Sequence, residues 1–290
     1  MKKMKPSKSR GILYMVLASF LFGIMTSFVK LSSHTLPPFE IVFFRSLIGF
    51  LTMTVILFKE KESFTGKQPG LLFLRGLFGF TALAMNFYAI SELNLGTAVI
   101  LNYTSPIFVA VISAIFLKEK VSSRLWILII LCFTGLYFLV GPQLSVKRFP
   151  IMIGLISGIM AALAYVTISM AKREESSYTI IFYFSMISII GSLPLLRSGF
   201  HIPLGTEWLS LLGVGVTASL AQIFLTRSIR EAPASVVCSF SYLTPVFSFL
   251  AGTLIWKDPL TGRMIFGAGL VILSGSLIYI LEKHAEPIVD

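Results

Sequence analysis

Charged side chains are scarce in this sequence. Lys, Arg, Asp and Glu together make up 13% of its 290 residues, whereas hydrophobic residues make up 56%. Soluble domains carry a charge on roughly a quarter of their residues, and a mean hydropathy of +0.88 lies far outside their usual range. The few charges fall in short clusters between apolar stretches of roughly 20 residues, the length that crosses a bilayer as a helix. The composition therefore argues against a water-soluble protein.

Cysteine is also rare, with Cys132 and Cys238 as the only two. Each lies inside an apolar stretch, and neither has a His or a second Cys at the spacing of metal ligands. We therefore expect no metal site and no disulfide, and both side chains should pack as small apolar groups.

The sequence lacks the motifs of ATP-driven pumps and of common membrane enzymes. It has no Walker A loop, no His-Glu-x-x-His, no Gly-x-Ser-x-Gly and no aspartate-rich cluster for diphosphate and magnesium. ATP-driven pumping, intramembrane proteolysis and prenyl transfer each need one of these groups. We therefore expect a protein that is not an enzyme, with no catalytic residues and no cofactor.

Ten apolar stretches are each long enough to cross about 30 Å of hydrocarbon as a helix. They lack the polar and apolar alternation of an outer-membrane barrel, and lipid cannot satisfy open backbone groups. We predict an all-α membrane protein with ten transmembrane helices, near 11–31, 38–58, 70–91, 96–117, 123–141, 150–171, 178–197, 206–229, 234–256 and 263–282.

The net charge of +11 is explained by topology rather than by nucleic-acid binding. Lys and Arg lie mostly at the ends of apolar stretches, and placing residues 1–10 inside puts most of them on the inner side, as the positive-inside rule requires. We predict a multi-pass protein of the inner (cytoplasmic) membrane, with both termini in the cytoplasm and no nucleic-acid partner.

The second half of the sequence repeats the first. A shift of 139 residues places 102–108 (NYTSPIF) on 241–247 (SYLTPVF) and 118–121 (KEKV) on 257–260 (KDPL). Each copy holds five predicted spans. Because five is odd, the second copy enters the membrane from the other side, and the two halves should be inverted repeats.

Several features of these copies resemble the EamA branch of the drug/metabolite transporter superfamily. Each copy has a Tyr-x-x-Pro-[Ile/Val]-Phe span, then a Lys-[Glu/Asp]-x-[Val/Leu] loop and a last span that contains glycine (Gly135 and Gly275). The segments 37–45 (PPFEIVFFR) and 75–79 (RGLFG) also look like the second and third spans of that family. The resemblance implies two five-helix repeats, at 1–145 and 146–290, around a central cavity.

The resemblance also implies transport of small metabolites, often amino acids or their relatives, and frequently outward. The first span, 11–31, has no acidic residue, unlike the small multidrug exporters of the superfamily, whose membrane glutamate binds cationic drugs and protons. We therefore predict a secondary transporter that exports an amino acid, a carboxylate or a related zwitterion or anion by alternating access. A flippase or carrier for a lipid-linked or amphipathic substrate in the same fold is the alternative.

The expected partners are the small-molecule substrate and the lipid bilayer, with protons or a counter-solute as the coupling species. Stripes of small residues at four-residue spacing, such as Gly154, Gly158 and Ala162, allow close helix packing within one chain. They do not distinguish a monomer from a homodimer, and both fit the sequence.

Arg45 is the clearest charge inside a predicted span, about two turns from the start of 38–58. An unpaired arginine at this depth costs roughly 2.5–3.5 kcal/mol on insertion scales. Glu40 is a poor partner, because five residues along a helix turn about 140° around its axis. Two interpretations stay open: a structural arginine that snorkels outward or bonds a backbone carbonyl, and one that binds an anionic group or works in a gate. Arg75, at the end of the third span, is interpreted as an interface anchor.

Polar side chains gather at mid-membrane depth around Pro106 and Pro245. Each proline removes a helical hydrogen bond and is expected to kink its span, either as a hinge for alternating access or as a fixed shape of the fold. Polar groups at this depth face either a cavity or a neighbouring helix, and both interpretations stay open. The cavity candidates are Asn102, Tyr103, Ser105, Ser239, Ser241 and Tyr242, joined on the same argument by Asn86, Tyr88, Tyr165 and Gln222.

Overall fold

The computed structural model describes residues 7–93, 95–141, 148–171, 174–196, 200–257 and 261–283. Over these ranges the chain forms helices and turns, with no strand. Ten of its helical stretches are long and apolar enough to cross a membrane, and each overlaps one of the ranges predicted from the sequence. The described part of the chain therefore confirms the all-α, ten-span architecture of a multi-pass membrane protein.

Seven spans are single helices and three are built from consecutive shorter pieces. The single helices are α1 (Lys8–Ser32), α2 (Pro38–Glu60), α3 (Pro69–Glu92), α6 (Ser123–Val140), α7 (Arg148–Ala171), α9 (Thr206–Glu231) and α12 (Gly262–Lys283). The fourth span consists of α4 (Leu95–Asn102) and α5 (Ser105–Phe116), and the seventh of α8 (Ser177–Ser192) and the 3-10 helix η1 (Leu193–Leu196). The ninth consists of α10 (Ala234–Val237), the 3-10 helix η2 (Cys238–Tyr242) and α11 (Leu243–Trp256).

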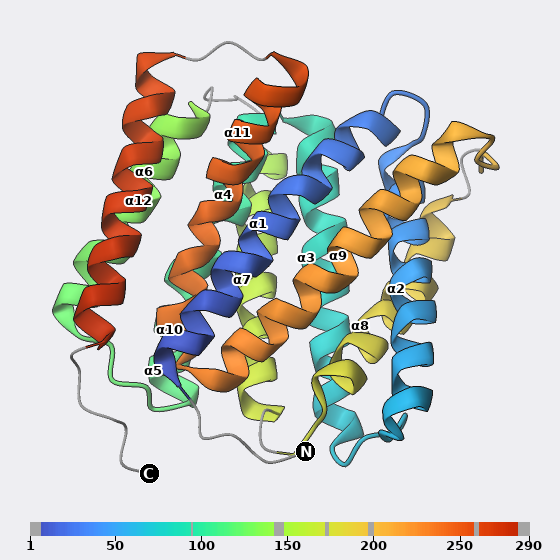
Figure 1. The fold of residues 1–290 in the computed structure, drawn as a ribbon, viewed down its shortest axis with the longest axis horizontal. Coiled ribbons are helices and arrows are strands. Elements are labelled where there is room, and N and C mark those ends of the chain that lie inside the picture. Colours follow the sequence, from blue (N-terminus) through green and yellow to red (C-terminus); the bar gives the residue numbers. More distant parts are fainter. Residues whose placement is uncertain are drawn as a thin grey trace.

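The helices pack in pairs that follow the sequence repeat. α1 lies along α9, and α3 lies along α7. The 139-residue repeat relates the first span (α1) to the sixth (α7) and the third span (α3) to the eighth (α9). It therefore maps the pair α1 and α9 onto the pair α7 and α3. α6 packs against α12 at one edge of the bundle and α2 against α8 at the other, so each of these helices meets its own counterpart (Figure 1). This exchange of partners is the packing expected of two inverted five-helix repeats.

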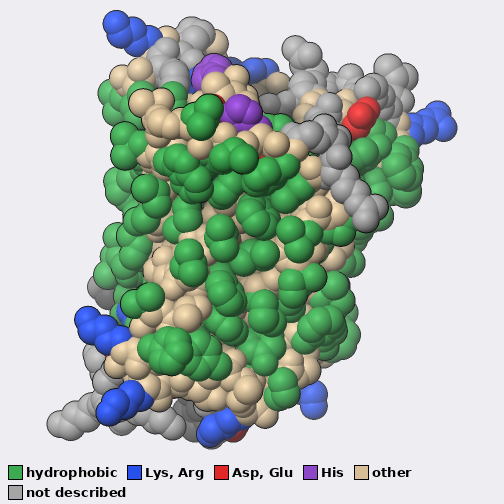
Figure 2. Space-filling model, turned by 90° about the vertical axis from the view of Figure 1, so that its right-hand side faces the viewer, with side chains coloured by type: hydrophobic (Ala, Val, Ile, Leu, Met, Phe, Trp, Pro, Cys, Tyr) green, Lys and Arg blue, Asp and Glu red, His purple; other side chains and the backbone are tan. Residues whose placement is uncertain are grey.

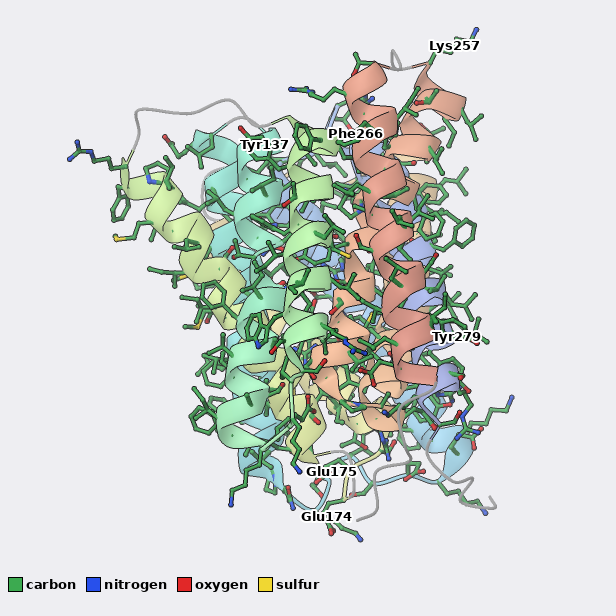
Figure 3. All side chains as sticks on the ribbon, turned by 90° about the vertical axis from the view of Figure 1, so that its left-hand side faces the viewer. Tyr137, Glu174, Glu175, Lys257, Phe266 and Tyr279 are labelled. Carbon is green, nitrogen blue, oxygen red and sulfur yellow. The ribbon has the colours of Figure 1, made fainter. Side chains whose placement is uncertain are left out.

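α1 begins and α12 ends at the same end of the bundle (Figure 1), where Lys8 Nζ lies 3.0 Å from Glu282 Oε2. We call this the terminal end and the other the opposite end. Figure 3 shows Glu174 and Glu175 at the terminal end and Lys257 at the opposite end. Between them the surface of the face in Figure 2 is mostly apolar, with Lys and Arg gathered near both ends. This distribution is that of a protein whose sides contact lipid.

The two spans that contain the paired prolines are broken rather than kinked. α4 ends at Asn102 and α5 begins at Ser105, which places Pro106 in the first turn of α5. Proline has no N–H to donate, and a first turn needs none, so the chain stops one helix and starts the next. Pro245 similarly lies in the first turn of α11, after the 3-10 helix η2. The loss of helical hydrogen bonding expected at each proline therefore takes the form of a break between shorter helices, which leaves irregular backbone at mid-membrane depth. A hinge at either proline stays a prediction.

The contact between α6 and α12 depends on Gly267. A Cβ there would overlap the backbone nitrogen of Leu139 and lie 2.6 Å from the carbonyl oxygen of Gly135, and backbone cannot move aside as a side chain does. We expect Gly267→Ala to lower stability by about 1–3 kcal/mol, the usual cost of overpacking. Thermal unfolding in detergent measures it. Gly269→Ala on the same helix is the control, because a Cβ there meets nothing within 4 Å; equal unfolding midpoints for the two variants would contradict the prediction.

Candidate substrate cavity

A small cavity lies at the centre of the bundle, at the depth of the two breaks. Its volume is about 60 Å³, and α1, α7 and α9 enclose it together with both broken spans. Five of the predicted candidates line it: Asn102, Tyr103, Ser105, Tyr165 and Ser241. The cavity therefore gathers side chains from both repeats, at a point where helical hydrogen bonding is interrupted.

Tyr103 and Tyr242 mark the junction of the two repeats. The shift of 139 residues aligns Tyr103 with Tyr242 in the sequence, and in the structure their ring centroids are 6.4 Å apart. Beside them, Asn102 Nδ2 donates to Ser157 Oγ at 3.2 Å, and Ser241 Oγ donates to the carbonyl of Cys238 at 2.7 Å. Because Pro106 and Pro245 have no N–H, the carbonyls of Asn102 and Ser241 also lose their usual helical donors. The junction is therefore a polar site inside an apolar bundle.

The other candidates lie outside the lining of this cavity. Ser239 donates to the carbonyl of Ser235 at 2.9 Å, within its own span. Among the described residues, Tyr242 Oη, Gln222 Oε1 and Asn86 Oδ1 are buried without a hydrogen-bond partner. Tyr88 is 36% exposed, and its ring packs edge-on against Phe149 with the centroids 6.3 Å apart. The structure thus does not bring Tyr88 to the cavity, because the helical phase of α3 turns it outward.

Arg75 does not lie at the membrane interface as its sequence position suggested. It is 3% exposed, and its Cζ lies 4.6 Å from the centroid of the Phe184 ring on α8. A Cβ on Gly79 would overlap Arg75 Nη1, so the guanidinium extends along α3 over this glycine. Gly79 is ten residues after Pro69, or about 15 Å along the helix. The interpretation as an anchor was therefore wrong: the arginine reaches toward the membrane centre.

Arg45 lies on α2, half-buried, and faces the same region. Arg45 lies one turn before Gly49, where a Cβ would lie 3.0 Å from Ser185 Oγ on α8, and the ring of the adjacent Phe184 covers Arg75. Both arginines also lie close enough to Tyr165, which lines the cavity, for their charges to act on it. Glu40 does not pair with Arg45, because Glu40 Oε1 accepts the backbone N–H of His201 at 2.8 Å. Two arginines, one predicted and one missed, therefore face the same part of α8, although neither is in the lining of the cavity. The four-residue spacing of Arg75 and Gly79, which leaves room for the guanidinium, is the signal that would have revealed the second.

The sequence profile of the EamA-like transporter family matches residues 9–141 and again residues 148–280. The chain belongs to this family. It is therefore a membrane transporter with a small-molecule substrate, and the two matches correspond to its two five-helix copies. The division at residue 145 stays a prediction.

Known relatives of this EamA-like protein are transporters with different substrates. It is 35% identical to the pseudopaline exporter CntI of Pseudomonas aeruginosa, over 91% of this chain and 94% of the relative. It is 23% identical to an S-adenosylmethionine uptake transporter of Rickettsia felis, over 90% and 88% of the two chains. A crystal structure with 17% identity superposes with a TM-score of 0.86 and covers 97% of this chain and 100% of that one, which shows the shared fold.

The terminal end of this EamA-like transporter is closed by polar contacts between the repeats. Glu119, in the loop between α5 and α6, accepts the N–H groups of Ala234 and Ser235 at 3.0 and 3.1 Å and the Ser235 hydroxyl at 2.6 Å. Arg10 Nη2 lies 2.5 Å from Glu231 Oε2. Glu175 accepts the N–H groups of Lys67 and Gln68, just before α3. Glu119 and Glu175 each bind the start of a helix, where a carboxylate satisfies free N–H groups and complements the helix dipole.

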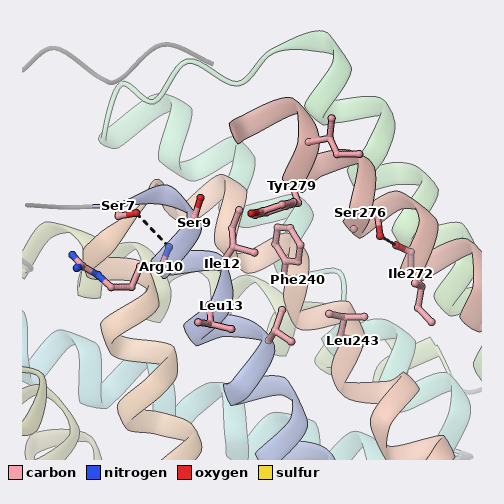
Figure 4. Close-up of a pocket in the computed structure, with 13 residues that line it drawn as sticks. Ser7, Ser9, Arg10, Ile12, Leu13, Phe240, Leu243, Ile272, Ser276 and Tyr279 are labelled. Atoms are coloured by element: carbon pink, nitrogen blue, oxygen red, sulfur yellow. Dashed lines mark hydrogen bonds between the residues drawn. The ribbon is translucent and has the colours of Figure 1, made fainter. Parts of the chain in front are cut away.

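A larger groove of about 730 Å³ runs along the outer surface between α1 and α12, near the terminal end (Figure 4). Its walls include Ile12, Leu13 and Ile272, with Phe240 and Leu243 also in its lining. α1 and η2 separate it from the central cavity, and Ser19 Oγ joins them by donating to the carbonyl of Phe240 at 3.2 Å. The groove is thus open to the bilayer and distinct from the cavity.

Proposed function

We propose that this protein is a secondary transporter that exports a small metabolite, an amino acid, a carboxylate or a related zwitterion or anion, by alternating access. The observation that carries the proposal is the meeting of the two broken spans at Tyr103 and Tyr242, beside the central cavity. In inverted-repeat transporters the substrate binds at such a junction near the bilayer midplane, where broken helices offer free backbone groups. Each of the two inverted repeats then takes up in turn the conformation of the other, and the site opens alternately to the two sides of the membrane.

The size of the cavity supports a closed state. Its volume of about 60 Å³ holds a few water molecules but no metabolite. Substrate entry therefore needs the helices to part, and the contacts of Glu119 and Glu175 favour closure at the terminal end. We place this end in the cytoplasm of a cell with an inner membrane, from the excess of Lys and Arg on that side. The structure then corresponds to a state closed toward the cytoplasm.

Flux measurements with purified protein in liposomes test the proposal. Liposomes loaded with a panel of amino acids and carboxylates should release at least one of them with saturable kinetics, and protein-free liposomes should not. An imposed pH gradient, or counter-solute outside, identifies the coupling species. Lipid translocation without flux of any soluble metabolite would overturn the proposal.

The lateral groove is the observation that favours the alternative, a carrier for a lipid-linked or amphipathic substrate. Such a substrate has to enter from the bilayer, and the groove is open to it. A Cβ on Gly275 would lie 3.7 Å from the Phe240 ring, so a leucine at this position would fill the groove without a clash at its base.

We expect Gly275→Leu to leave the flux of soluble metabolites within about twofold of the wild-type rate, because α1 and η2 separate the groove from the central cavity in which the substrate is proposed to bind. Initial rates from liposomes with equal amounts of folded protein measure the effect. Gly269→Leu, on the same helix, controls for the added side chain. Loss of flux in Gly275→Leu alone would show that the substrate travels through the groove.

A further inference from the structure

Two arginines that face α8, Arg75 buried and Arg45 half-buried, have no counter-charge in the described part of the chain. Among the residues that the structure describes, neither Arg45 nor Arg75 forms an ion pair or a hydrogen bond. Arg75 Nε and Nη1 are fully buried without a partner. A charge taken out of water is normally paired and hydrogen-bonded. An uncompensated pair of guanidinium groups therefore points to an anion that the protein binds.

The two carboxylates that are buried in the described part of the chain each accept backbone N–H groups instead of pairing with an arginine. The carboxylate of Glu40, one turn and a half before Arg45 on α2, accepts the N–H of His201 at the opposite end. Glu175 accepts the N–H groups of Lys67 and Gln68 at the terminal end. Tyr165, which interacts with both arginines, is a neutral hydroxyl and balances neither charge.

Packing holds the Arg75 guanidinium in place although its Nε and Nη1 have no hydrogen-bond partner among the residues described. The Phe184 ring covers it at 4.6 Å, a cation–π contact that stabilises the charge without neutralising it. Gly79 leaves the space that Nη1 occupies. The side chain is therefore preorganised, and a ligand that binds it does not have to order it first.

We propose that Arg45 and Arg75 bind the two carboxylates of a substrate that carries at least two of them. The inference rests on the transport function proposed above and narrows its substrate class. Each guanidinium presents N–H donors in a planar fork that matches one carboxylate. A substrate with a single carboxylate would leave one arginine unbalanced in a medium of low dielectric constant, and the like charges would still repel each other.

The test compares dicarboxylates with monocarboxylates of similar length. Purified protein in lipid nanodiscs is titrated with succinate, glutarate and glutamate, and with butyrate, valerate and 4-aminobutyrate, at constant ionic strength. The thermal unfolding midpoint is recorded at each concentration. We expect at least one dicarboxylate to raise the midpoint with saturation and its monocarboxylate counterpart to have no effect. Equal effects of the two, or no effect of any dicarboxylate, would overturn the inference.

Variants assign the effect to the two arginines. Arg45→Gln and Arg75→Gln should each weaken the apparent affinity for the dicarboxylate by about tenfold or more, the loss expected for a charge-assisted hydrogen bond. Arg124→Gln, which removes an exposed charge at the start of α6, should leave it unchanged. Arg45→Lys and Arg75→Lys serve where a glutamine variant fails to fold, and they should also weaken binding because lysine has no fork. Unchanged affinity in the variants at both positions would overturn the inference.

Failure of this inference is distinguishable from failure of transport. Saturable liposome flux of a metabolite with one carboxylate or none, unchanged in Arg45→Gln and Arg75→Gln, would overturn the dicarboxylate assignment while the transport function stood. Absence of all soluble flux in the wild-type protein would instead overturn the transport function.

Discussion

Glu119→Ala is expected to open the terminal end of the protein and to reduce transport. The change removes three hydrogen bonds from α10, the first piece of the broken ninth span, and leaves the N–H groups of Ala234 and Ser235 without partners. Each buried donor left unpaired costs about 1–3 kcal/mol. Since 1.4 kcal/mol is a factor of ten, even one of these donors left unpaired should shift the equilibrium between closed and open states by roughly 10- to 100-fold.

Cys238 provides a native reporter of this opening. It is 0% exposed and lies directly after α10, so a maleimide reagent reaches it only when this segment moves. In a background where Cys132 is replaced by alanine, labelling of Cys238 should be slow in the wild-type protein and faster in Glu119→Ala by about the same 10- to 100-fold factor. Glu119→Gln, which keeps one acceptor oxygen, should fall between them.

Glu174→Ala is the matched control for the loss of a carboxylate at the terminal end. Glu174 is exposed, and its oxygen lies 3.7 Å from Lys67 Nζ in a surface ion pair, a type of contact that contributes about 0–1 kcal/mol. Cys238 in Glu174→Ala should be labelled at the same rate as in the wild-type protein. Equal rates in Glu119→Ala and Glu174→Ala would contradict a role for Glu119 in closing this end.

Gly79→Ala is expected to impair transport although it changes no charged residue. The added Cβ would overlap Arg75 Nη1 and lie 2.9 Å from the Phe184 ring, so the guanidinium has to leave its position over the ring. Misplacing a binding group by about 1 Å costs on the order of 100-fold in a preorganised site. We expect substrate flux at low concentration to fall by about 10- to 100-fold, mainly through a raised KM.

Gly70→Ala is the control for this prediction. It lies on the same helix, and a Cβ there meets nothing within 4 Å. Alanine has a higher helix propensity than glycine, so Gly70→Ala should match or exceed the wild-type stability by roughly 0.5–1 kcal/mol. If Gly79→Ala transports at the rate of Gly70→Ala, the position of the Arg75 guanidinium has no part in substrate binding.

The span count and the repeat could be predicted from the sequence because lipid allows few solutions. A bilayer requires every backbone group to be bonded within the segment, so an apolar stretch of 20 residues is a helix. Five spans per copy then imply inversion. The candidates around Pro106 and Pro245 could also be located, because proline disrupts a helix wherever the fold places it. Asn102, Tyr103, Ser105 and Ser241 reach the cavity for this reason.

The direction of individual side chains could not be predicted in the same way. Both faces of α3 are apolar, since one contacts lipid and the other contacts protein, so the pattern does not indicate which way Tyr88 or Arg75 points. Tyr88 turns outward onto Phe149, whereas Arg75 runs inward over Gly79 to the Phe184 ring. Phe184 is more than 100 positions from Arg75, and only the packing of α8 on α3 brings the two together.

The sequence by itself determined a ten-helix membrane protein with two related halves, and it located the polar centre of both. These features follow from local rules: the length of apolar stretches, the effect of proline and the parity of the repeat. The tertiary structure alone decided that the centre is a small cavity, that Arg45 and Arg75 face α8 without a counter-charge among the described residues, and that Glu119 binds the start of α10 in the other repeat. These features depend on contacts between helices far apart in the chain, which local rules do not specify.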